Sequence, residues 1–188
     1  NQQTVNIDVV TPTGSVQLVK DVVPNSDTGK FNLSVTPSGG AAATATDVGD
    51  GGSVTKSSIT AGTVVTLAET AGTGTSLANY TSSLACVNSA TGASVPVTSN
   101  QITMPTPPIG IVCTYTNTRK SATLQLKKQW SNAKVGDSAS LTATGIVNSA
   151  TAALDSTAGS AGELDAGNAV TVYGAEEHTP GLPARPRK

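Results

Sequence analysis

Charged and aromatic side chains are both scarce in this chain of 188 residues, at 12% and 3% of the sequence. This is a low charge content for a cytosolic enzyme, and it suits an extracellular β-protein. The formal net charge of −1 gives no reason to expect nucleic acid or an acidic membrane surface as a partner. The shortage of aromatic rings also argues against a site that stacks on sugar rings.

Residue types that serve catalysis and metal binding are equally rare. His178 is the single histidine, and it lies in a polar tail. Because this one histidine is far from any nucleophile elbow, no Ser-His-Asp constellation is expected to activate the serine-rich stretches, and multi-turnover hydrolase activity is not expected. The stretch DVGDGG, with Asp47 and Asp50, resembles a calcium loop but lacks regularly spaced acidic ligands and the terminal Glu. We interpret it as a solvated turn, and we expect no metal and no cofactor.

Long apolar runs are absent, so the sequence predicts neither a transmembrane helix nor a signal peptide, and membrane insertion is not expected. The chain begins at Asn1 rather than Met, which is typical of a mature product or of a piece of a longer chain. The segment LPARP near the end lacks the Thr-Gly of a sortase signal. Covalent attachment to a Gram-positive wall is therefore not predicted.

Small and β-branched residues make up most of the chain. Thr, Ser, Ala and Val are abundant, and 19 Gly and 10 Pro separate the strand-like segments. β-branched residues favour pleated strands, whereas Gly, Pro, Asn and Asp favour the turns between them. Long helical periodicity is absent. The sequence therefore predicts an all-β fold, a Greek-key sandwich of the prealbumin or immunoglobulin-like type.

Three polar residues lie in line with the apolar face of a predicted strand. Alternate residues of a strand share one face. In VQLVKDV, VVTLAE and IVCTYTN, counting by two from the apolar residues leads to Lys20, Glu69 and Asn117 respectively. A buried Lys or Glu is costly unless it is paired, hydrogen-bonded or neutralised. The three groups therefore predict a shared interior site.

A lysine, a glutamate and an asparagine in contact could form an internal amide. Burial lowers the pKa of an amine and raises that of a carboxylic acid, so such a pair can be neutral at pH 7. The amine of Lys20 could then attack the carboxamide of Asn117 while Glu69 polarises its carbonyl and shuttles protons, with release of ammonia. In the alternative, Lys20 extends to the sheet edge and Asn117 only caps a strand. Lys30 and Lys56 are other, solvated lysines that could take part.

The order of these motifs resembles a known family. An early strand with Lys, a middle strand with Glu followed later by Asn-Tyr, and a last strand reading TYTN are similar to the CnaB-type or SpaA-like prealbumin repeats of bacterial pilins and adhesins. The resemblance covers Ser15 to Thr118. It implies that Lys20 is the amine donor, Asn117 the acceptor and Glu69 the catalyst of an isopeptide bond. It also implies a structural module of a stalk, pilus or fibre on the bacterial cell surface, and not an enzyme for external substrates.

The two cysteines, Cys86 and Cys113, both lie in strand-like segments of the same predicted module. An even pair in a chain that resembles a secreted protein favours a disulfide over a metal site, because no second ligand pair accompanies it. A disulfide would indicate an oxidising compartment. The alternative is two buried free thiols that pack as small apolar residues.

The first strand motif is repeated further along the chain. VQLVKDV recurs as LQLKKQW, which aligns Lys128 with Lys20 and makes Lys128 a candidate lysine of a second module. In the same register Trp130 is expected to pack in the core. We therefore divide the chain into an N-terminal strand or linker, a complete sandwich, a partial second sandwich and a Pro-rich basic tail, at residues 1–14, 15–119, 120–173 and 174–188.

Neighbouring repeats or subunits of the same protein are the expected partners. Truncation of a longer repeat array explains the partial second sandwich, but another subunit could instead complete it. The segment TVNIDVV, which alternates Val5, Ile7 and Val9, could be donated to a neighbour and build a filament by strand complementation. A second alternative is a tip domain whose loops bind a host or polysaccharide receptor.

Overall fold

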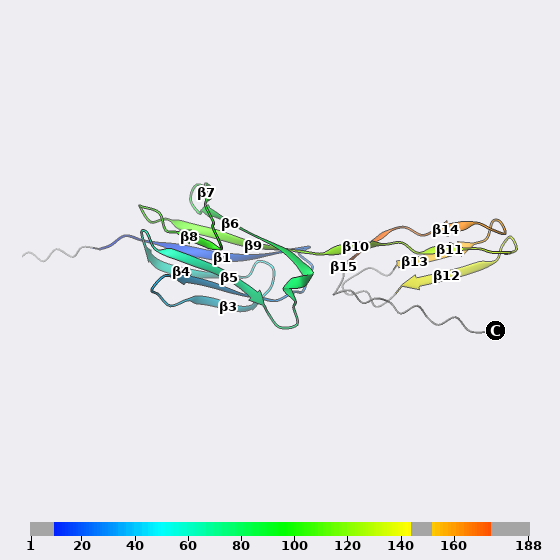
Figure 1. Ribbon diagram of the computed structural model, residues 1–188, viewed down its shortest axis with the longest axis horizontal. Helices are drawn as coiled ribbons and strands as arrows, with labels where there is room; N and C mark the ends of the chain where they lie inside the picture. The colour runs from blue at the N-terminus through cyan, green and yellow to red at the C-terminus, as the bar shows by residue number, and fades with distance from the viewer. Residues whose placement is uncertain (1–9, 144–151, 174–188) are drawn as a thin grey trace, which may run out of the picture. The chain divides into compact units, whose positions relative to one another are not determined.

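The computed structural model describes residues 10–143 and 152–173 of the chain (Figure 1). The predicted N-terminal strand around Ile7 and the tail that holds His178 lie outside these residues. Within these ranges every regular element is a β-strand except one short 3-10 helix, which confirms the all-β prediction. None of the described helical residues forms a helix long and apolar enough to cross a membrane. The chain divides between Thr118 and Arg119 into two compact units, and each is described by itself.

The first unit is a sandwich of two sheets, as predicted (Figure 1). One sheet has the strand order β4-β1-β9-β6-β7, and its strands in chain order are β1 (Thr13–Val23), β4 (Ser53–Thr60), β6 (Tyr80–Asn88), β7 (Ser94–Val95) and β9 (Gly110–Arg119). The other sheet has the order β3-β2-β5-β8, and its strands are β2 (Phe31–Pro37), β3 (Ala43–Val48), β5 (Val64–Ala71) and β8 (Gln101–Thr103). The 3-10 helix η1 (Leu77–Asn79) leads into β6.

Strands β1 and β9 lie side by side and run parallel, although they are the first and last strands of this unit. Their ladder extends from Ser15 opposite Gly110 to Val23 opposite Thr118. On its other side β1 pairs with β4 in the antiparallel sense. Strand β5 pairs antiparallel with β2 and β8 in the facing sheet. The beginning and the end of the unit are thus joined in one ladder.

The core of the first unit consists of side chains that alternate along these strands. In β1 and β2 every second residue is buried, and the residues between them are half-buried or exposed. The buried residues of the larger cluster come from both sheets, which is how two facing sheets exclude water from the space between them. They are Val16, Leu18, Leu33, Val35, Ile59, Val65, Leu67, Cys86, Ile102, Met104, Ile111, Cys113 and Tyr115.

The second unit repeats part of this pairing pattern. Its described strands are β10 (Ser121–Leu124), β11 (Lys127–Gln129), β12 (Ser138–Ala143), β13 (Ala152–Thr157), β14 (Leu164–Ala166) and β15 (Val170–Tyr173). Strands β10 and β11 pair antiparallel with β15 and β14, as β1 does with β4, and β12 pairs with β13, as β2 does with β3. Trp130 is buried here and donates a hydrogen bond from Nε1 to Ser156 Oγ at 2.8 Å.

Substitution of Leu67 by Ala tests the core of the first unit. Leu67 is fully buried in β5, so the shorter side chain leaves a cavity and should lower the free energy of unfolding by about 2–5 kcal/mol. Urea denaturation of the variant and of the parent protein measures this difference. Thr70→Ala, at an exposed position of the same strand, is the control and should change stability by less than about 0.5 kcal/mol. Equal losses in the two variants would contradict this assignment of the core.

Candidate functional site

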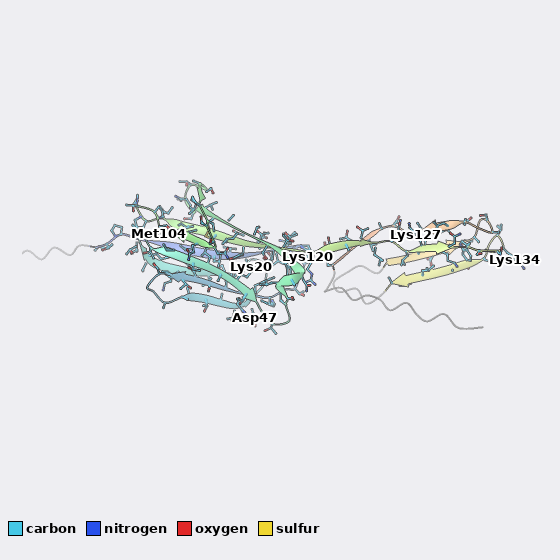
Figure 2. All side chains as sticks on the ribbon, viewed as in Figure 1. Lys20, Asp47, Met104, Lys120, Lys127 and Lys134 are labelled. Atoms are coloured by element: carbon cyan, nitrogen blue, oxygen red, sulfur yellow. A yellow bond between two sulfur atoms is a disulfide. The ribbon has the colours of Figure 1, made fainter. Side chains whose placement is uncertain are left out.

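Lys20 lies on the inner face of β1 and is completely buried, although its side chain carries an amine. In the parallel ladder it stands opposite Tyr115 of β9. Its Nζ donates a hydrogen bond to the backbone carbonyl of Tyr115 at 2.7 Å and lies 2.9 Å from Glu69 Oε2. Figure 2 shows Lys20 within the body of the sandwich. The amine is therefore held inside the unit and does not extend to the sheet edge.

Glu69 reaches this amine from the facing sheet. It lies on β5, where it stands opposite Leu33 of β2, and only 4% of its side chain is exposed. One carboxylate oxygen, Oε2, contacts the amine of Lys20, and the other, Oε1, accepts a hydrogen bond from Asn117 Nδ2 at 2.8 Å. A single carboxylate thus holds the amine and the amide on either side of it.

Asn117 completes the group from β9. It is fully buried and stands opposite Val22, two residues beyond the position opposite Lys20, so both side chains enter the sandwich on the same face. Its Oδ1 is buried and has no hydrogen-bond partner among the described residues. The expectation that Glu69 polarises this carbonyl differs from the geometry, because the carboxylate contacts the amide nitrogen instead.

Apolar side chains enclose the three polar groups from two directions. The larger core cluster covers one side, with Leu18, Leu33 and Leu67 preceding or flanking the polar positions on their strands. A smaller cluster covers the other side and consists of Val22, Phe31 and Tyr80, with Leu77 packed against it. The Phe31 ring centroid lies 4.6 Å from Lys20 Nζ, and the Tyr80 ring meets Phe31 edge-on at 5.3 Å. The three polar side chains are therefore bordered by apolar clusters and almost inaccessible to solvent.

Burial determines the protonation preference of the amine. Desolvation lowers the pKa of Lys20 below its ordinary value of 10.5, although Glu69, Asp21 and Asp50 each act in the opposite direction. The pKa of the neighbouring Tyr115 is raised, first by burial and then by the negative charge of Glu69. A lowered pKa makes the neutral, nucleophilic form of Lys20 more accessible.

Cys86 and Cys113 form a disulfide, which confirms that prediction. The bond joins β6 to β9, two neighbouring strands of the same sheet, and both cysteines are buried. Cys113 lies four residues before Asn117 on the same face of β9. The disulfide therefore fixes the strand that presents the amide.

The other predicted lysines do not reach this group. Lys30 is exposed, and Lys56 is half-buried on β4, whereas the carboxylate of Glu69 is paired with Lys20. In the second unit Lys128 is half-buried on β11, with Nζ 4.4 Å from the Trp130 ring centroid and 3.4 Å from the Gln129 carbonyl oxygen. Lys128 thus lies beside an aromatic ring, as Lys20 lies beside Phe31.

The aspartates of the DVGDGG stretch accept hydrogen bonds from other parts of the chain. Asp47, whose backbone φ is +52°, accepts two hydrogen bonds from Thr73, and Asp50 accepts one from the Val22 N–H and one from Asn25 Nδ2. Across residues 10–143 and 152–173, no group of three or more His, Cys, Asp or Glu side chains is arranged to hold a metal ion. The two aspartates therefore join loops and strands of the chain.

Three contacts around the site are not among the sequence-based predictions. Phe31 could have been found, because it alternates with Leu33 and Val35 on the inner face of FNLSVT. The carbonyl of Tyr115 could not have been found, because a backbone acceptor leaves no signal in the sequence. The carboxylate of Asp50 could not have been found either, because the loop that holds it resembles an ion site. Both contacts depend on which strands are neighbours.

A family of known proteins matches the first unit. Residues 15–119 match the family of SpaA-type prealbumin-like fold domains. The chain belongs to this family. Similar solved structures include an adhesin of Mobiluncus mulieris that contains intramolecular disulfide, isopeptide and ester bond cross-links, at 19% identity and a TM-score of 0.43 over 57% of this chain and 41% of that one. Another is the major pilin T-13 of Streptococcus pyogenes, at 18% identity and a TM-score of 0.41 over 58% of this chain and 46% of that one.

This chain spans less than half the length of either of those solved chains. No curated protein sequence matches it. The family match shows a prealbumin-like fold for the first unit.

The lowered pKa of Lys20 predicts how stability depends on pH. In Asn117→Ala the amine remains titratable beside Glu69. Between the lowered pKa of the folded state and the ordinary 10.5, the unfolded chain binds more protons, so the free energy of unfolding should rise with pH in that window. Urea denaturation at steps up to pH 10 measures the slope, since the raised pKa of Tyr115 acts in the opposite direction above its ordinary value of 10.0. Lys20→Met/Asn117→Ala is the control and should lose this part of the slope.

Removal of the disulfide should weaken the first unit. The bond closes a loop with a sequence separation of 27 residues, for which the chain-entropy relation gives roughly 3.5 kcal/mol. Urea denaturation of Cys86→Ala/Cys113→Ala, compared with the disulfide-bonded parent, measures the loss. Both proteins should carry Asn117→Ala, so that no other crosslink shares the loop. An unchanged denaturation midpoint would contradict the assigned role of the bond.

Proposed function

We propose that the first unit forms an autocatalytic amide between Lys20 and Asn117 and serves as a structural module of a bacterial surface fibre, pilus or adhesin stalk. One observation carries the proposal: the carboxylate of Glu69 contacts the amine of Lys20 and the amide of Asn117 at 2.9 and 2.8 Å within an enclosed interior. The proposal implies a secreted protein at the cell surface, and the disulfide suits the oxidising environment found there.

The proposed reaction begins with proton transfer from the Lys20 ammonium to Glu69, which leaves a neutral amine. Lys20 Nζ then attacks Asn117 Cγ, and the Nζ–Cγ bond forms. Glu69 gives the proton that it took from the ammonium to Nδ2, which already donates to its Oε1. It then takes up the proton that Nζ releases after the attack and passes that proton to Nδ2 as well. The Cγ–Nδ2 bond breaks, ammonium leaves, and the carboxylate is regenerated. In sum, one ammonium and one carboxamide become one secondary amide and one ammonium ion.

The position of the bond suits a load-bearing module. Lys20 lies on the first strand of the unit and Asn117 on the last, and the two strands are parallel neighbours. An amide between them closes a loop of nearly the whole unit, which on the chain-entropy relation adds roughly 4–5 kcal/mol to stability. A force applied at the two ends of the unit would then pass through the amide. The residues between Lys20 and Asn117 in the sequence would carry little of the load.

Intact mass spectrometry of the purified protein tests the proposal. Loss of one ammonia lowers the mass by about 17 Da, and a crosslinked peptide that contains Lys20 and Asn117 should appear after digestion. Glu69→Ala should keep the full mass, because the amine and the amide then lack their proton carrier. Thr70→Ala, the neighbouring exposed position, is the matched control and should lose the ammonia as the parent does. A parent protein of full mass with a free Lys20 would rule out the crosslink.

A further inference from the structure

Strand β1 extends beyond the strand that pairs with it on one side. The β1–β4 ladder ends where Val19 stands opposite Ser53, whereas β1 continues to Val23. The backbone groups of Lys20 and Val22 therefore lie beyond the first residue of β4, Ser53, on that side of the sheet. Buried or half-buried backbone groups need another partner at such a place.

The turn between β3 and β4 supplies these partners. The Lys20 N–H donates to the Gly52 carbonyl at 2.7 Å, and the Gly51 N–H donates to the Lys20 carbonyl at 2.9 Å. One step further on, the Val22 N–H donates to Asp50 Oδ1 at 2.8 Å. The carboxylate of Asp50 thus takes the place of a backbone acceptor that a longer β4 would have provided. Its second oxygen accepts a hydrogen bond from Asn25 Nδ2 at 3.2 Å.

We propose that Asp50 is a positioning residue for amide formation, because its carboxylate holds the end of β1 in the register that brings Lys20 to Glu69 and Asn117. This inference rests on the proposed function. Val22, whose N–H Asp50 binds, stands opposite Asn117 in the parallel ladder. Asp50 therefore acts on the segment of β1 where the donor and acceptor strands must align.

The contribution of Asp50 is positional, since its charge opposes the reaction. The groups that act on the Lys20 amine are Glu69 from β5, Asp21 from β1 and Asp50 from the turn, and all three favour the charged ammonium. A nucleophile must be neutral, so removal of the Asp50 charge alone should not slow the attack. Removal of the hydrogen-bond acceptor should slow it.

Three substitutions at position 50 separate the two effects. Asp50→Ala removes the acceptor and the charge, and the rate of ammonia loss should fall by about tenfold or more. Asp50→Ser places a shorter side chain there and should also be slower than the parent. Asp50→Asn keeps an oxygen that can accept from Val22 but carries no charge, and its rate should stay within about twofold of the parent rate.

Asp47→Ala is the matched control. Asp47 lies at the end of β3 close to the same turn and also accepts two hydrogen bonds, but its partners belong to Thr73 and not to β1. Because its φ is positive, the alanine adds backbone strain, so this variant should be destabilised at least as much as Asp50→Ala. It should nevertheless crosslink at the parent rate.

The rates are measured on protein synthesised in vitro, sampled over time and quenched in acidic denaturant. Free thiols are alkylated, and the fraction that has lost ammonia is counted only among disulfide-bonded chains, since the Cys86–Cys113 bond reports a folded first unit. The inference is supported if Asp50→Ala loses ammonia slowly while Asp50→Asn and Asp47→Ala lose it at about the parent rate. If the alanine variant does not form the disulfide, Asp50→Ser takes its place in this comparison.

Three results would overturn the inference while leaving the crosslink intact. In the first, Asp50→Ala or Asp50→Ser loses ammonia at the parent rate. In the second, Asp50→Asn is as slow as Asp50→Ala. In the third, Asp47→Ala is slowed as much as Asp50→Ala. A parent protein that never loses ammonia instead overturns the proposed function itself. The two failures are thus distinguishable in one experiment.

Discussion

One carboxylate between the two sheets determines the arrangement of the first unit. Glu69 comes from β5, and it pairs with an amine of β1 and an amide of β9 in the facing sheet. Without it, the sandwich would enclose an unpaired amine, which is among the most unfavourable groups to bury. The contact therefore links the folding of the sandwich to its proposed chemistry, because the carboxylate meets the amine and the amide only when both sheets are assembled.

The apolar residues are divided around this polar group. The larger cluster ends at Leu18, Leu67 and Tyr115, and the smaller one begins with Val22 and Phe31. The smaller cluster stands between the polar groups and the end of the sandwich, where Tyr80 is fixed by a hydrogen bond to Asp27 at 2.7 Å. It therefore excludes water from a site in which desolvation lowers the pKa of the amine.

The site residues could be located from the sequence because apolar residues alternate with a period of two in the strand segments that lead to them. Lys20, Glu69 and Asn117 each follow a series of alternating apolar residues. In the structure these apolar residues are buried on the same face of the strand as the polar residue. The alternation says which face a residue occupies but not which strand lies beside it. The hydrogen bonds from Nζ to the Tyr115 carbonyl and from Val22 to Asp50 depend on strand order and on the end of a ladder. Those are properties of the assembled sheet.

The parallel direction of β1 and β9 decides what a covalent bond between them can do. If the two strands were antiparallel neighbours, a pull on their outer ends would open the ladder one hydrogen bond at a time. In parallel neighbours the incoming chain reaches Thr13 at one end of the sheet and the outgoing chain leaves at Arg119 at the other, so the same pull shears the whole ladder at once. An amide from Lys20 to Asn117, near the outgoing end, would place the part of β1 from Thr13 to Lys20 in the direct line of force. The nearly one hundred residues that form the rest of the sandwich would lie outside that line and keep the amide dry.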